Sequence, residues 1–519
     1  MGDDAASLPV EPGPGAPTPP IALPDPAAAT GRLGTPAIDL PHQLVERLRA
    51  TGASVELGAA ERVEASRDWW PLAMTWAASG QVPAVAAAVA RPSHADQVPD
   101  VLRLCHDARV PVTAAGGRSG VTGAAVPLFG GVVLDLCGLA GVRAVDRDDF
   151  VVDVLAGTFG DRLEQELRRD HGLTVGHWPQ SVTLSTVGGW LACRGAGQLS
   201  NRYGTVEDLV LGLDVVLADG TVVHTGGHAR QAVGPDLTQL FVGSEGTLGV
   251  ITAARLRTWP VPAAERRAAY AFATFEEGAD ACRRIVQRGI SPAALRLYDA
   301  VEADRSHGTG DVAVLLVFDE GDPAVVAAAT TVTEEECTGA DRLDDTLVDR
   351  WLEHRNDVSA LEALVSRGYV VDTMELTAAW SAIPALYPAV RDAIARVPGV
   401  IAASAHLSHS YPEGACLYFT FAGEPAEPAT ESRDALYLAC WDAGTRTALA
   451  HGGSLSHHHG VGLNRSRFVE EALGAGATSV LAALKAALDP AGILNPGKLG
   501  LPSAFGPVPF PPTLPRSDQ

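Results

Sequence analysis

The spacing of apolar positions predicts an α/β arrangement from residue 82 onward. Apolar runs of strand length alternate there with amphipathic segments whose apolar positions recur every three to four residues. An Asp219-Gly220 dipeptide between two apolar runs indicates a β-hairpin, because these residues accept the backbone angles of a tight two-residue turn. The expected helices are residues 95–106 and 161–171, and the expected strands are residues 111–115, 131–136, 150–155, 215–218 and 221–223.

A second unit is predicted after the proline break at residues 260–262. Its order is strand, helix, strand, strand, helix, which is typical of an α+β domain. We expect this unit, residues 263–500, to act as a cap on the first unit, residues 82–262. The pattern places strands at residues 269–272, 294–298 and 312–318 and helices at residues 276–288 and 323–337.

The two ends of the chain carry little apolar periodicity. Residues 1–36 hold eight prolines between Pro9 and Pro26, so we expect a disordered tail, and residues 501–519 are expected to be flexible for the same reason. Residues 37–81 are expected to be a helical segment, with one helix at residues 41–49. The tryptophans of residues 66–79 are interpreted as a lid packed on the domain, with a functional aromatic platform as the alternative.

Charge and cysteine usage narrow the class of protein. The net charge of -23 argues against nucleic acid or an anionic membrane as the main partner, since both need a basic surface. The seven cysteines are scattered singly, which indicates free thiols in a reducing compartment. No continuous apolar run of spanning length and no secretory leader pattern are found, so we expect a cytoplasmic protein without a transmembrane segment.

Two glycine-rich segments suggest a ligand that lies against the backbone. Residues 116–120 read Gly-Gly-Arg-Ser-Gly after an apolar strand, and residues 185–197 are dense in serine, threonine, alanine and glycine. Successive N–H groups in such loops form a concavity that suits a pyrophosphate. The glycine spacing fits neither the dinucleotide fingerprint nor the P-loop, so each loop alone is equally well explained as a simple turn.

Polar side chains concentrate in two later blocks. Residues 405–421 combine histidines and tyrosines with an apolar strand, and residues 453–462 set His457, His458 and His459 before two glycines. Histidine at near-neutral pH can transfer protons, so the triplet is a candidate for acid–base chemistry. A solvated loop or a metal site are the alternative interpretations.

Taken together, these segments resemble a known superfamily. The order PVTAAGGRSG, PQSVTLSTVGGWLACRGAG, YGTVEDLV and VGSEGTLGVIT is similar to the FAD-binding domain of the vanillyl-alcohol-oxidase (PCMH-type) flavoproteins, over residues 82–262. Within that superfamily the likeness is greatest to the alkylglycerone-phosphate synthases and continues to the C-terminus. The resemblance implies an α+β fold: a PCMH-type FAD-binding domain of two α/β subdomains, an α+β substrate cap and a C-terminal helical segment.

The resemblance also implies roles for individual residues. It assigns catalysis to Tyr411, His457, His458, His459 and Arg296, and substrate binding to Arg355 and His406. No metal is implied. Because Arg118 stands where relatives with a covalent flavin have histidine, we expect FAD to be held non-covalently. The implied cofactor-binding residues are Gly116, Gly117, Arg118, Ser119, Gly120, Pro179, Gln180, Ser181, Ser185, Thr186, Gly188, Gly189, Cys193, Arg194, Gly195, Ala196, Gly243, Ser244, Glu245, Gly246, Thr247, Leu248 and Gly249.

The implied reaction replaces the acyl chain of acylglycerone phosphate by a fatty alcohol, as in ether-lipid synthesis. A base must remove a C1 proton, and we expect cationic imidazoles to lower the pKa of the Tyr411 phenol for this purpose. An arginine fork suits the phosphate, although Arg296 could instead form a structural ion pair with Asp299.

Departures from the synthase pattern keep two other interpretations open. Arg118 replaces a threonine and His406 replaces an arginine of the family. The chain could instead be an FAD-linked oxidase or dehydrogenase of a 2-hydroxy acid or alcohol, or a flavin-binding protein without catalysis. The dehydrogenases hold a divalent metal through blocks that differ here, which favours the synthase interpretation. The expected partner is a small-molecule or lipid substrate; peripheral membrane contact and a homodimer are left open.

Overall fold

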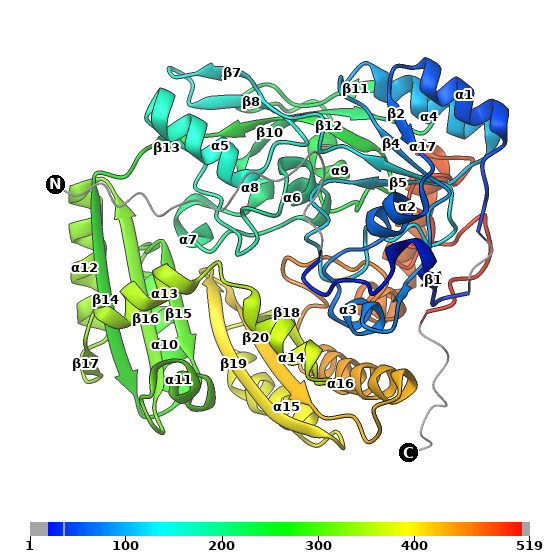
Figure 1. The fold of residues 1–519 in the computed structure, drawn as a ribbon. Coiled ribbons are helices and arrows are strands. Elements are labelled where there is room, and N and C mark those ends of the chain that lie inside the picture. The colour runs from blue at the N-terminus through cyan, green and yellow to red at the C-terminus, as the bar shows by residue number, and fades with distance from the viewer. Residues whose placement is uncertain (1–18, 35–36, 511–519) are drawn as a thin grey trace.

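A computed structural model describes residues 19–34 and 37–510 of the 519-residue chain. The FAD-binding domain predicted from the sequence occupies the upper part of Figure 1, and the cap lies below it as one broad antiparallel sheet with helices against it. The C-terminal segment, red in Figure 1, returns from the cap to the first domain. The arrangement confirms the α+β fold with two α/β subdomains and a cap.

The first domain contains two main sheets. The four-stranded sheet has the order β2-β4-β6-β5, in which β4, β6 and β5 are parallel and β2 is antiparallel to β4. The five-stranded sheet is antiparallel, in the order β11-β10-β12-β8-β7. Their strands are β2 Ser54–Glu56, β4 Ala88–Arg91, β5 Val112–Ala115, β6 Val132–Asp135, β7 Val142–Asp146, β8 Val151–Leu155, β10 Val210–Val216, β11 Val222–His224 and β12 Val250–Arg257.

Short helices cover these sheets and carry the glycine-rich segments. The helix α6 begins after Thr186, whose hydroxyl accepts a hydrogen bond from the Gly189 amide and so caps the helix start. The helices of the N-terminal segment and first domain are α1 His42–Ala50, α2 Ala59–Ala65, α3 Pro71–Ala77, α4 Gln97–Ala108, α5 Gly160–Glu166, α6 Val187–Cys193, α7 Ser200–Tyr203, α8 Val206–Leu209 and α9 Leu237–Phe241, with short turns η1 Pro26–Ala28 and η2 Leu167–His171. Two strand pairs, β1 Thr30–Gly31 with β3 Gln81–Val82 and β9 Leu173–Thr174 with β13 Trp259–Pro260, complete this part.

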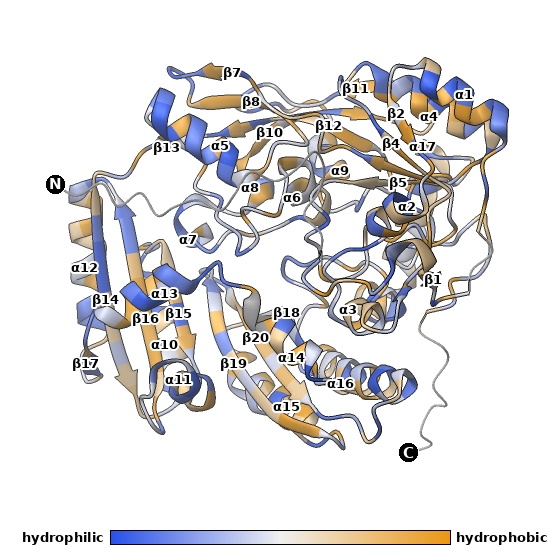
Figure 2. Ribbon diagram, viewed as in Figure 1, coloured by the Kyte–Doolittle hydropathy of each residue, from blue (hydrophilic) through white to orange (hydrophobic). Residues whose placement is uncertain are grey.

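The cap is built on a seven-stranded antiparallel sheet in the order β17-β14-β16-β15-β19-β20-β18. The sheet is coloured largely orange in Figure 2, because its strands are rich in apolar residues that helices cover. Its strands are β14 Ala264–Phe272, β15 Ala294–Tyr298, β16 Ala313–Gly321, β17 Asp341–Leu343, β18 Val370–Ala379, β19 Val400–Ser410 and β20 Gly414–Gly423. Its helices are α10 Phe275–Gln287, α11 Ala300–His307, α12 Pro323–Glu336, α13 Thr346–His354, α14 Ser359–Ser366, α15 Ile383–Ala395 and α16 Thr430–Ala450.

The chain crosses between the two domains at both ends of its fold. Trp70 and Trp76 of the N-terminal segment are buried in an apolar core made mainly of cap residues, so these two rings are packing residues and not an exposed aromatic platform. In the other direction, the C-terminal segment with η3 Ser466–Phe468 and α17 Val469–Leu488 leads to Ile493 and Leu494, which are buried among the strands of the first domain. The expected boundary at residues 263–500 is therefore a sequence boundary rather than a spatial one.

The two predicted tails are partly ordered, which corrects the expectation of a disordered segment over residues 1–36. Ile21 and Leu23 are buried in an apolar cluster with Trp69, and β1 pairs in parallel with β3. At the other end, Phe510 packs edge-on against Trp70, with ring centroids 5.0 Å apart. Apolar residues placed between the prolines supply enough burial to order these stretches; residues 1–18, 35–36 and 511–519 lie outside the described residues.

Most predicted elements are confirmed, and the exceptions are local. The hairpin at Asp219-Gly220 joins β10 and β11 as expected. The helix α11 between β15 and β16 was not predicted; Asp299 caps its start by accepting from the Glu302 amide. The segment Ser466–Leu488 is long and apolar enough to cross a membrane by length and composition. However, Gly474 interrupts the helix, and the remaining stretch of about 21 Å falls short of the roughly 30 Å bilayer core.

Candidate active site

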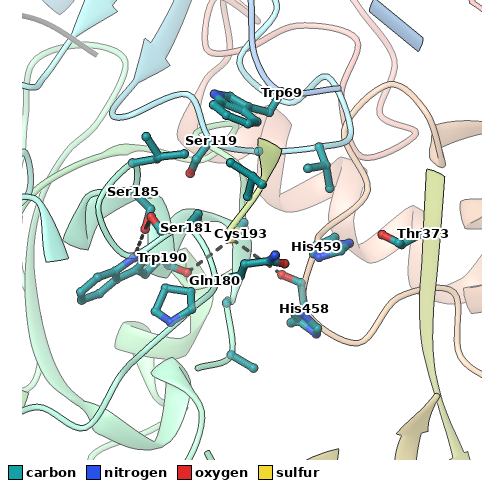
Figure 3. Close-up of a pocket in the computed structure, with 18 of the residues that line it drawn as sticks. Trp69, Ser119, Gln180, Ser181, Ser185, Trp190, Cys193, Thr373, His458 and His459 are labelled. Atoms are coloured by element: carbon teal, nitrogen blue, oxygen red, sulfur yellow. Dashed lines mark hydrogen bonds between the residues drawn. The ribbon is translucent and has the colours of Figure 1, made fainter. Parts of the chain in front are cut away.

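A cavity of about 1040 Å³ lies between the FAD-binding domain and the cap. The glycine loop at residues 116–120 and the start of α6 form one wall, and β15, β19, β20 and the histidine loop, residues 456–462, form the other. Figure 3 shows Ser119, Ser181 and Ser185 on one side of this space and His458, His459 and Thr373 on the other. The volume is at the upper end of the range of about 300–1000 Å³ for ligand sites, which suits a cofactor and a substrate together.

The glycine loop is held by close backbone packing. A Cβ atom on Gly117 would lie 1.9 Å from the carbonyl oxygen of Leu184, so no other residue fits without backbone movement. The left-handed backbone angle of the loop belongs to Arg118, whose φ is 52°, and not to Gly117. The glycine is therefore required by contact between two loops of the protein, which differs from the ligand contact that the sequence suggested.

Several polar groups along this wall fit a phosphate-bearing cofactor. The Nε and Nη1 atoms of Arg118 are buried without a hydrogen-bond partner, and Nη1 lies 3.6 Å from an Asp135 carboxylate oxygen. A Cβ atom on Gly120 would meet no protein atom within 4 Å, so the backbone there faces open space. Buried guanidinium N–H groups without a hydrogen-bond acceptor are uncommon in folded proteins, and an anionic ligand such as the FAD pyrophosphate would supply acceptors for these two atoms of Arg118.

The implied cofactor residues fall into two groups. Most line the large cavity: Gly116, Gly117, Arg118, Ser119, Gly120, Pro179, Gln180, Ser181, Ser185, Thr186, Gly188, Gly189, Cys193, Gly195, Ala196, Glu245, Gly246 and Gly249. The others line a second cavity on the far side of the same loops: Arg194, Gly243, Ser244, Thr247 and Leu248. The second group therefore supports the loop and does not face the cofactor space.

Four side chains form a row across the cap sheet, and three of them face the large cavity. Strand pairing places Glu375 opposite Tyr418, Tyr418 opposite His406, and His406 opposite Tyr298. The rings of His406 and Tyr418 are stacked, with centroids 4.9 Å apart. Tyr298, His406 and Tyr418 line the cavity, and Glu375 lies behind the histidine loop.

At one end of this row, Arg296 and His406 form a polar cluster. The Arg296 Nη2 group donates to His406 Nε2 at 2.7 Å, and Nε donates to the Tyr298 hydroxyl at 2.7 Å. His406 Nδ1 in turn contacts Glu302 Oε1 at 2.9 Å. Burial and Arg296 lower the pKa of His406, while His406 holds the pKa of Glu302 down at about 2. His406 is therefore neutral and protonated on Nδ1, because Arg296 can only donate.

The alternative ion pair between Arg296 and Asp299 is not formed. Asp299 accepts from the Ala405 amide at 2.7 Å and from the Tyr387 hydroxyl at 3.2 Å. Arg296 instead faces the cavity, together with Arg305 and Arg350. This end of the cavity therefore has a local excess of positive charge in a protein of net charge -23.

Arg355, to which the resemblance assigns substrate binding, also lines the cavity. Its guanidinium lies over the rings of Trp178 and Trp351, 5.7 and 5.8 Å from the ring centroids. Its Nη1 atom is buried without a hydrogen-bond partner in the protein, and burial lowers the pKa of the group. Such an atom is ready to donate to an anion.

An apolar limb extends from the large cavity between α14 and the N-terminal segment. Trp69, Val121, Leu184, Val358 and Leu361 line the cavity and belong to one apolar cluster. Ile21 and Leu23 are buried members of the same cluster. The limb therefore depends on residues that the sequence assigned to a disordered tail.

The histidine loop is anchored by one buried carboxylate. Glu375 Oε1 accepts from the amides of His457, His458 and His459 at 3.2, 3.1 and 2.8 Å. Arg465 pairs with the same carboxylate, and both side chains are fully buried. Arg465 and the histidine loop hold the pKa of Glu375 well below its usual value. The loop can make this tight turn because Gly460 and Gly462 take positive φ angles of 78° and 52°.

The structure brings Tyr418, His459 and Glu375 into line. The Tyr418 hydroxyl lies 2.7 Å from His459 Nε2, and His459 Nδ1 lies 3.2 Å from Glu375 Oε2. We call these three residues the triad, because a hydroxyl, an imidazole and a carboxylate in this order can transfer a proton. The His459–Glu375 contact has an ion-pair distance without hydrogen-bond geometry, so the carboxylate acts on the imidazole through its charge. His458 Nε2 also contacts the Tyr418 hydroxyl, at 3.2 Å.

Tyr411 and His457 occupy a different place from the one implied. Tyr411 lies in the hairpin turn between β19 and β20, and neither residue lines the large cavity. The Tyr411 hydroxyl contacts His457 Nε2 at 2.6 Å, and His457 lines the second cavity. The expected lowering of the Tyr411 pKa is wrong: burial raises it, and burial lowers the pKa of His457 to about 4, so no cationic imidazole adjoins the phenol.

Sequence reasoning missed Tyr418, Glu375 and His409 as site residues. Tyr418 was visible in the motif that also contains Tyr411, and strand alternation from Cys416 would have placed it on the same face as Thr420. Glu375 lies in a segment, residues 373–380, that the likeness already covered. No local signal indicates its contact with a loop some 80 residues later.

Two protein families match most of the chain. Residues 86–226 match the FAD binding domain family, and residues 261–499 match the family described as FAD linked oxidases, C-terminal domain. Both families bind or use FAD, and the cavity presents a fitting wall of glycine and arginine groups. FAD is therefore the cofactor of this chain.

The relatives include a synthase and an oxidoreductase. An alkyldihydroxyacetonephosphate (alkylglycerone-phosphate) synthase of Dictyostelium discoideum is 29% identical over 81% of this chain and 74% of its own length. An uncharacterised FAD-linked oxidoreductase of Escherichia coli (strain K12) is 30% identical over 80% of this chain and 89% of its own length. A solved alkyldihydroxyacetonephosphate synthase structure matches with a TM-score of 0.75 at 23% identity, covering 92% of this chain and 88% of that one.

Proposed function

This chain belongs to the FAD-linked oxidases of the vanillyl-alcohol-oxidase superfamily, and on that premise we propose that it is a transferase resembling alkylglycerone-phosphate synthase. In the proposed reaction the acyl chain of an acylglycerone phosphate is replaced by a fatty alcohol. The coarser assignment, an FAD-linked enzyme, does not depend on this choice. The finer one rests on the shape and charge of the large cavity.

The observation that carries the proposal is that the cavity has two unlike ends. Arg296, Arg305 and Arg350 gather at the cap side, where they suit a phosphate, and Arg355 adds a buried donor without a partner. The apolar limb beside α14 suits an acyl or alkyl chain. A small 2-hydroxy acid has a carboxylate for the first end but nothing to fill the second.

The acid–base work falls to the triad. When bound, FAD supplies an electrophilic ring system that can accept and return electrons at the substrate carbon. The Tyr418 oxygen takes the C1 proton of the substrate as the Tyr418 hydroxyl proton moves to His459 Nε2. The resulting imidazolium is held against the Glu375 carboxylate, which is ionised because its pKa is low. Tyr418 thus acts as the group that touches substrate, and His459 stores the proton.

The remaining polar residues orient the substrate. Arg296 is fixed by Tyr298 and His406, so its planar group keeps one orientation toward the cavity. His406, held neutral as described above, adds no positive charge but keeps Arg296 in place. His458 donates to or accepts from the Tyr418 hydroxyl and so adjusts which way that hydroxyl points.

A second function is supported by a different observation. The E. coli relative, which is described as an FAD-linked oxidoreductase, is as similar to this chain as the synthase is. Oxidation of a 2-hydroxy acid or alcohol would use the same triad as the base for the hydroxyl proton and the same arginines for a carboxylate. This alternative gives no role to the apolar limb, which is why we prefer the transferase.

The decisive experiment incubates the purified holoenzyme with palmitoyl-glycerone phosphate and hexadecanol and measures the ether product by mass spectrometry. In parallel, oxygen uptake and dye reduction are followed with a panel of 2-hydroxy acids and alcohols. The transferase proposal predicts ether product and little uptake. Flavin reduction by a hydroxy acid without any ether product would replace it by the oxidase function.

Two tyrosine variants test the triad. Tyr418→Phe should retain FAD and lose on the order of 10²–10⁴ in turnover, the usual contribution of a positioned acid or base. Tyr411→Phe is the matched comparison, since it removes an equivalent hydroxyl from the same hairpin outside the large cavity. If Tyr411→Phe costs more turnover than Tyr418→Phe, the triad assignment is wrong.

The cellular setting follows the same proposal. The seven cysteines are all free, as a reducing compartment favours, so we propose a cytoplasmic location. Synthesis of ether lipids would be the biological role. Localisation of a tagged chain and lipid analysis of a deletion strain would test both.

A further inference from the structure

The histidine loop separates the large cavity from a second one of about 390 Å³. Cys193 and Glu245 line both spaces, whereas His458 and His459 line only the first and His457 lines only the second. The rest of the second cavity is largely apolar, with exposed Arg194 among its lining residues. Its apolar lining residues include Leu240, Val242, Leu248, Leu481, Leu499 and Leu501.

A continuous chain of hydrogen bonds crosses the loop between the two cavities. The Tyr411 hydroxyl contacts His457 Nε2 at 2.6 Å, and His457 Nδ1 contacts His458 Nδ1 at 2.6 Å. His458 Nε2 contacts the Tyr418 hydroxyl at 3.2 Å, and that hydroxyl contacts His459 Nε2 at 2.7 Å. Both ring nitrogens of His457 and of His458 are therefore used in the chain.

The chain is consistent in its proton positions. A contact between two ring nitrogens needs one N–H and one lone pair, so His457 and His458 are held as complementary neutral tautomers. Burial lowers the pKa of both imidazoles, which keeps them neutral near pH 7. Passing one proton along the chain exchanges the tautomer of each histidine and leaves both neutral at the end.

We propose that His457, which lines the second cavity, and Tyr411 form the route by which protons leave and enter the acid–base triad during turnover, an inference that rests on the proposed function. Substrate and FAD fill the large cavity, so Tyr418 and His459 are cut off from bulk water while the reaction proceeds. The triad must nevertheless return to its starting state in each cycle. The hydrogen-bond chain through the histidine loop supplies the connection between the triad and solvent.

One proton leaves the triad by a series of coupled transfers along the chain. His459 Nε2 returns its proton to the Tyr418 oxygen, as the Tyr418 hydroxyl proton moves to His458 Nε2. The His458 Nδ1 proton moves to His457 Nδ1, and the His457 Nε2 proton moves to the Tyr411 oxygen as the proton of the partly exposed Tyr411 hydroxyl passes to a water molecule. His459, Tyr418, His458 and His457 all end neutral, and one proton has gained access to solvent. Reversal of the same steps delivers a proton to the triad.

A metal ion bound by the histidines of this chain is a competing outcome. His409, His457 and His458 each offer a ring nitrogen, and these atoms lie within 4.8 Å of one another, close enough to hold a metal ion. A metal there would occupy the ring nitrogens that the chain needs. Metal analysis of the purified holoenzyme therefore belongs to the test.

The experiment removes His457 in two ways. His457→Gln keeps a hydrogen-bonding side chain but cannot pass a proton, and we expect turnover to fall by roughly 10²-fold with FAD occupancy and Tm unchanged. His457→Ala opens space into the second cavity, so added imidazole should restore activity. His459→Ala should not be restored, because its site lies in the cavity that substrate fills. Ser200→Ala, which removes the hydroxyl bonded to His409 beside the chain, is the matched control.

The outcomes separate the two proposals. If the wild type makes ether product but His457→Gln stays within about twofold of it, or imidazole fails to restore folded, FAD-loaded His457→Ala, the proton route is overturned and the transferase proposal stands. A stoichiometric metal in the purified protein also overturns the route. If the wild type makes no ether product, the transferase proposal fails, and the imidazole test is run with whichever alcohol or hydroxy acid reduces the flavin.

Discussion

Replacing Glu375 by glutamine should destabilise the holoenzyme strongly. The side chain is fully buried, pairs with the equally buried Arg465, and accepts from three successive amides of the histidine loop and from Ser456. Glutamine keeps the shape but leaves the Arg465 charge without a counter-charge. Loss of one partner of a buried ion pair costs about 3–5 kcal/mol. For a unit of a few hundred residues this lowers Tm by roughly 6–20 °C.

The pH dependence of this loss has a definite sign. The pKa of Glu375 is depressed in the folded protein, so its stabilisation is complete above the ordinary value of 4.5 and is lost only as the pH falls through the lower folded value. The difference between wild type and Glu375→Gln should therefore be constant from about pH 6 to pH 8. Urea and thermal unfolding, followed by circular dichroism and by flavin release, measure it.

A double variant provides the control. Glu375→Gln with Arg465→Gln removes the orphaned charge as well, and it should be more stable than Glu375→Gln alone. A loss below about 1 kcal/mol in the single variant, or a double variant no better than the single one, would refute the reasoning that this pair anchors the histidine loop.

Four further outcomes are expected. Acid precipitation should release all flavin as free FAD, because arginine at position 118 cannot form a histidyl bond; yellow precipitate would contradict this. Gly120→Val should lower FAD occupancy while the apoprotein Tm changes little, since the new side chain meets open space rather than protein; unchanged occupancy would remove the loop from the cofactor site. Arg296→Lys should raise KM for the phosphorylated substrate and leave Tm nearly unchanged, because the planar fork of the guanidinium is lost. A lower Tm with unchanged kinetics would show that the role of Arg296 is structural. Stability should fall as the pH drops from about 6.5 toward 3, because His177, whose pKa is lowered to about 3 by burial, stays neutral in the folded state while the unfolded chain takes up a proton; His177→Leu should flatten this slope in urea titrations.

The cofactor-binding wall of the large cavity could be predicted from the sequence, because each of its segments is short and continuous. Glycine loops, the capped start of α6 and the turn around Glu245 each reveal themselves within about ten residues. The resemblance then joined them into one FAD-binding domain, and the match to the FAD binding domain family, over residues 86–226, includes the glycine loop and the start of α6. Within this wall the sequence could not tell which side of a loop faces the cavity, and Arg194 and Ser244 accordingly fell on the other side.

The row of side chains across the cap sheet could not be predicted in the same way, because it depends on the register between strands that are distant in the sequence. Tyr411 and Tyr418 stand in one motif, and only the hairpin turn at residues 411–413 decides which phenol faces the cavity. Glu375 comes opposite Tyr418 through pairing of β18 with β20. Apolar periodicity predicts strands but leaves their relative register open, and a shift of one residue would turn every side chain to the other face.

The two carboxylates that hold the histidine loop have a mechanical consequence. Glu375 belongs to the cap and binds three amides of the loop, while Glu245 belongs to the FAD-binding domain and binds the amides of Val461 and Gly462. Movement of the cap away from the first domain would break one of these two sets of hydrogen bonds and leave a buried carboxylate without its donors. The two domains therefore move as a single block at the histidine loop. Under the proposed function, long-chain substrates would then be exchanged by local displacement of α14 and residues 19–34 at the apolar limb, and crosslinking these two segments should trap substrate without distorting the triad.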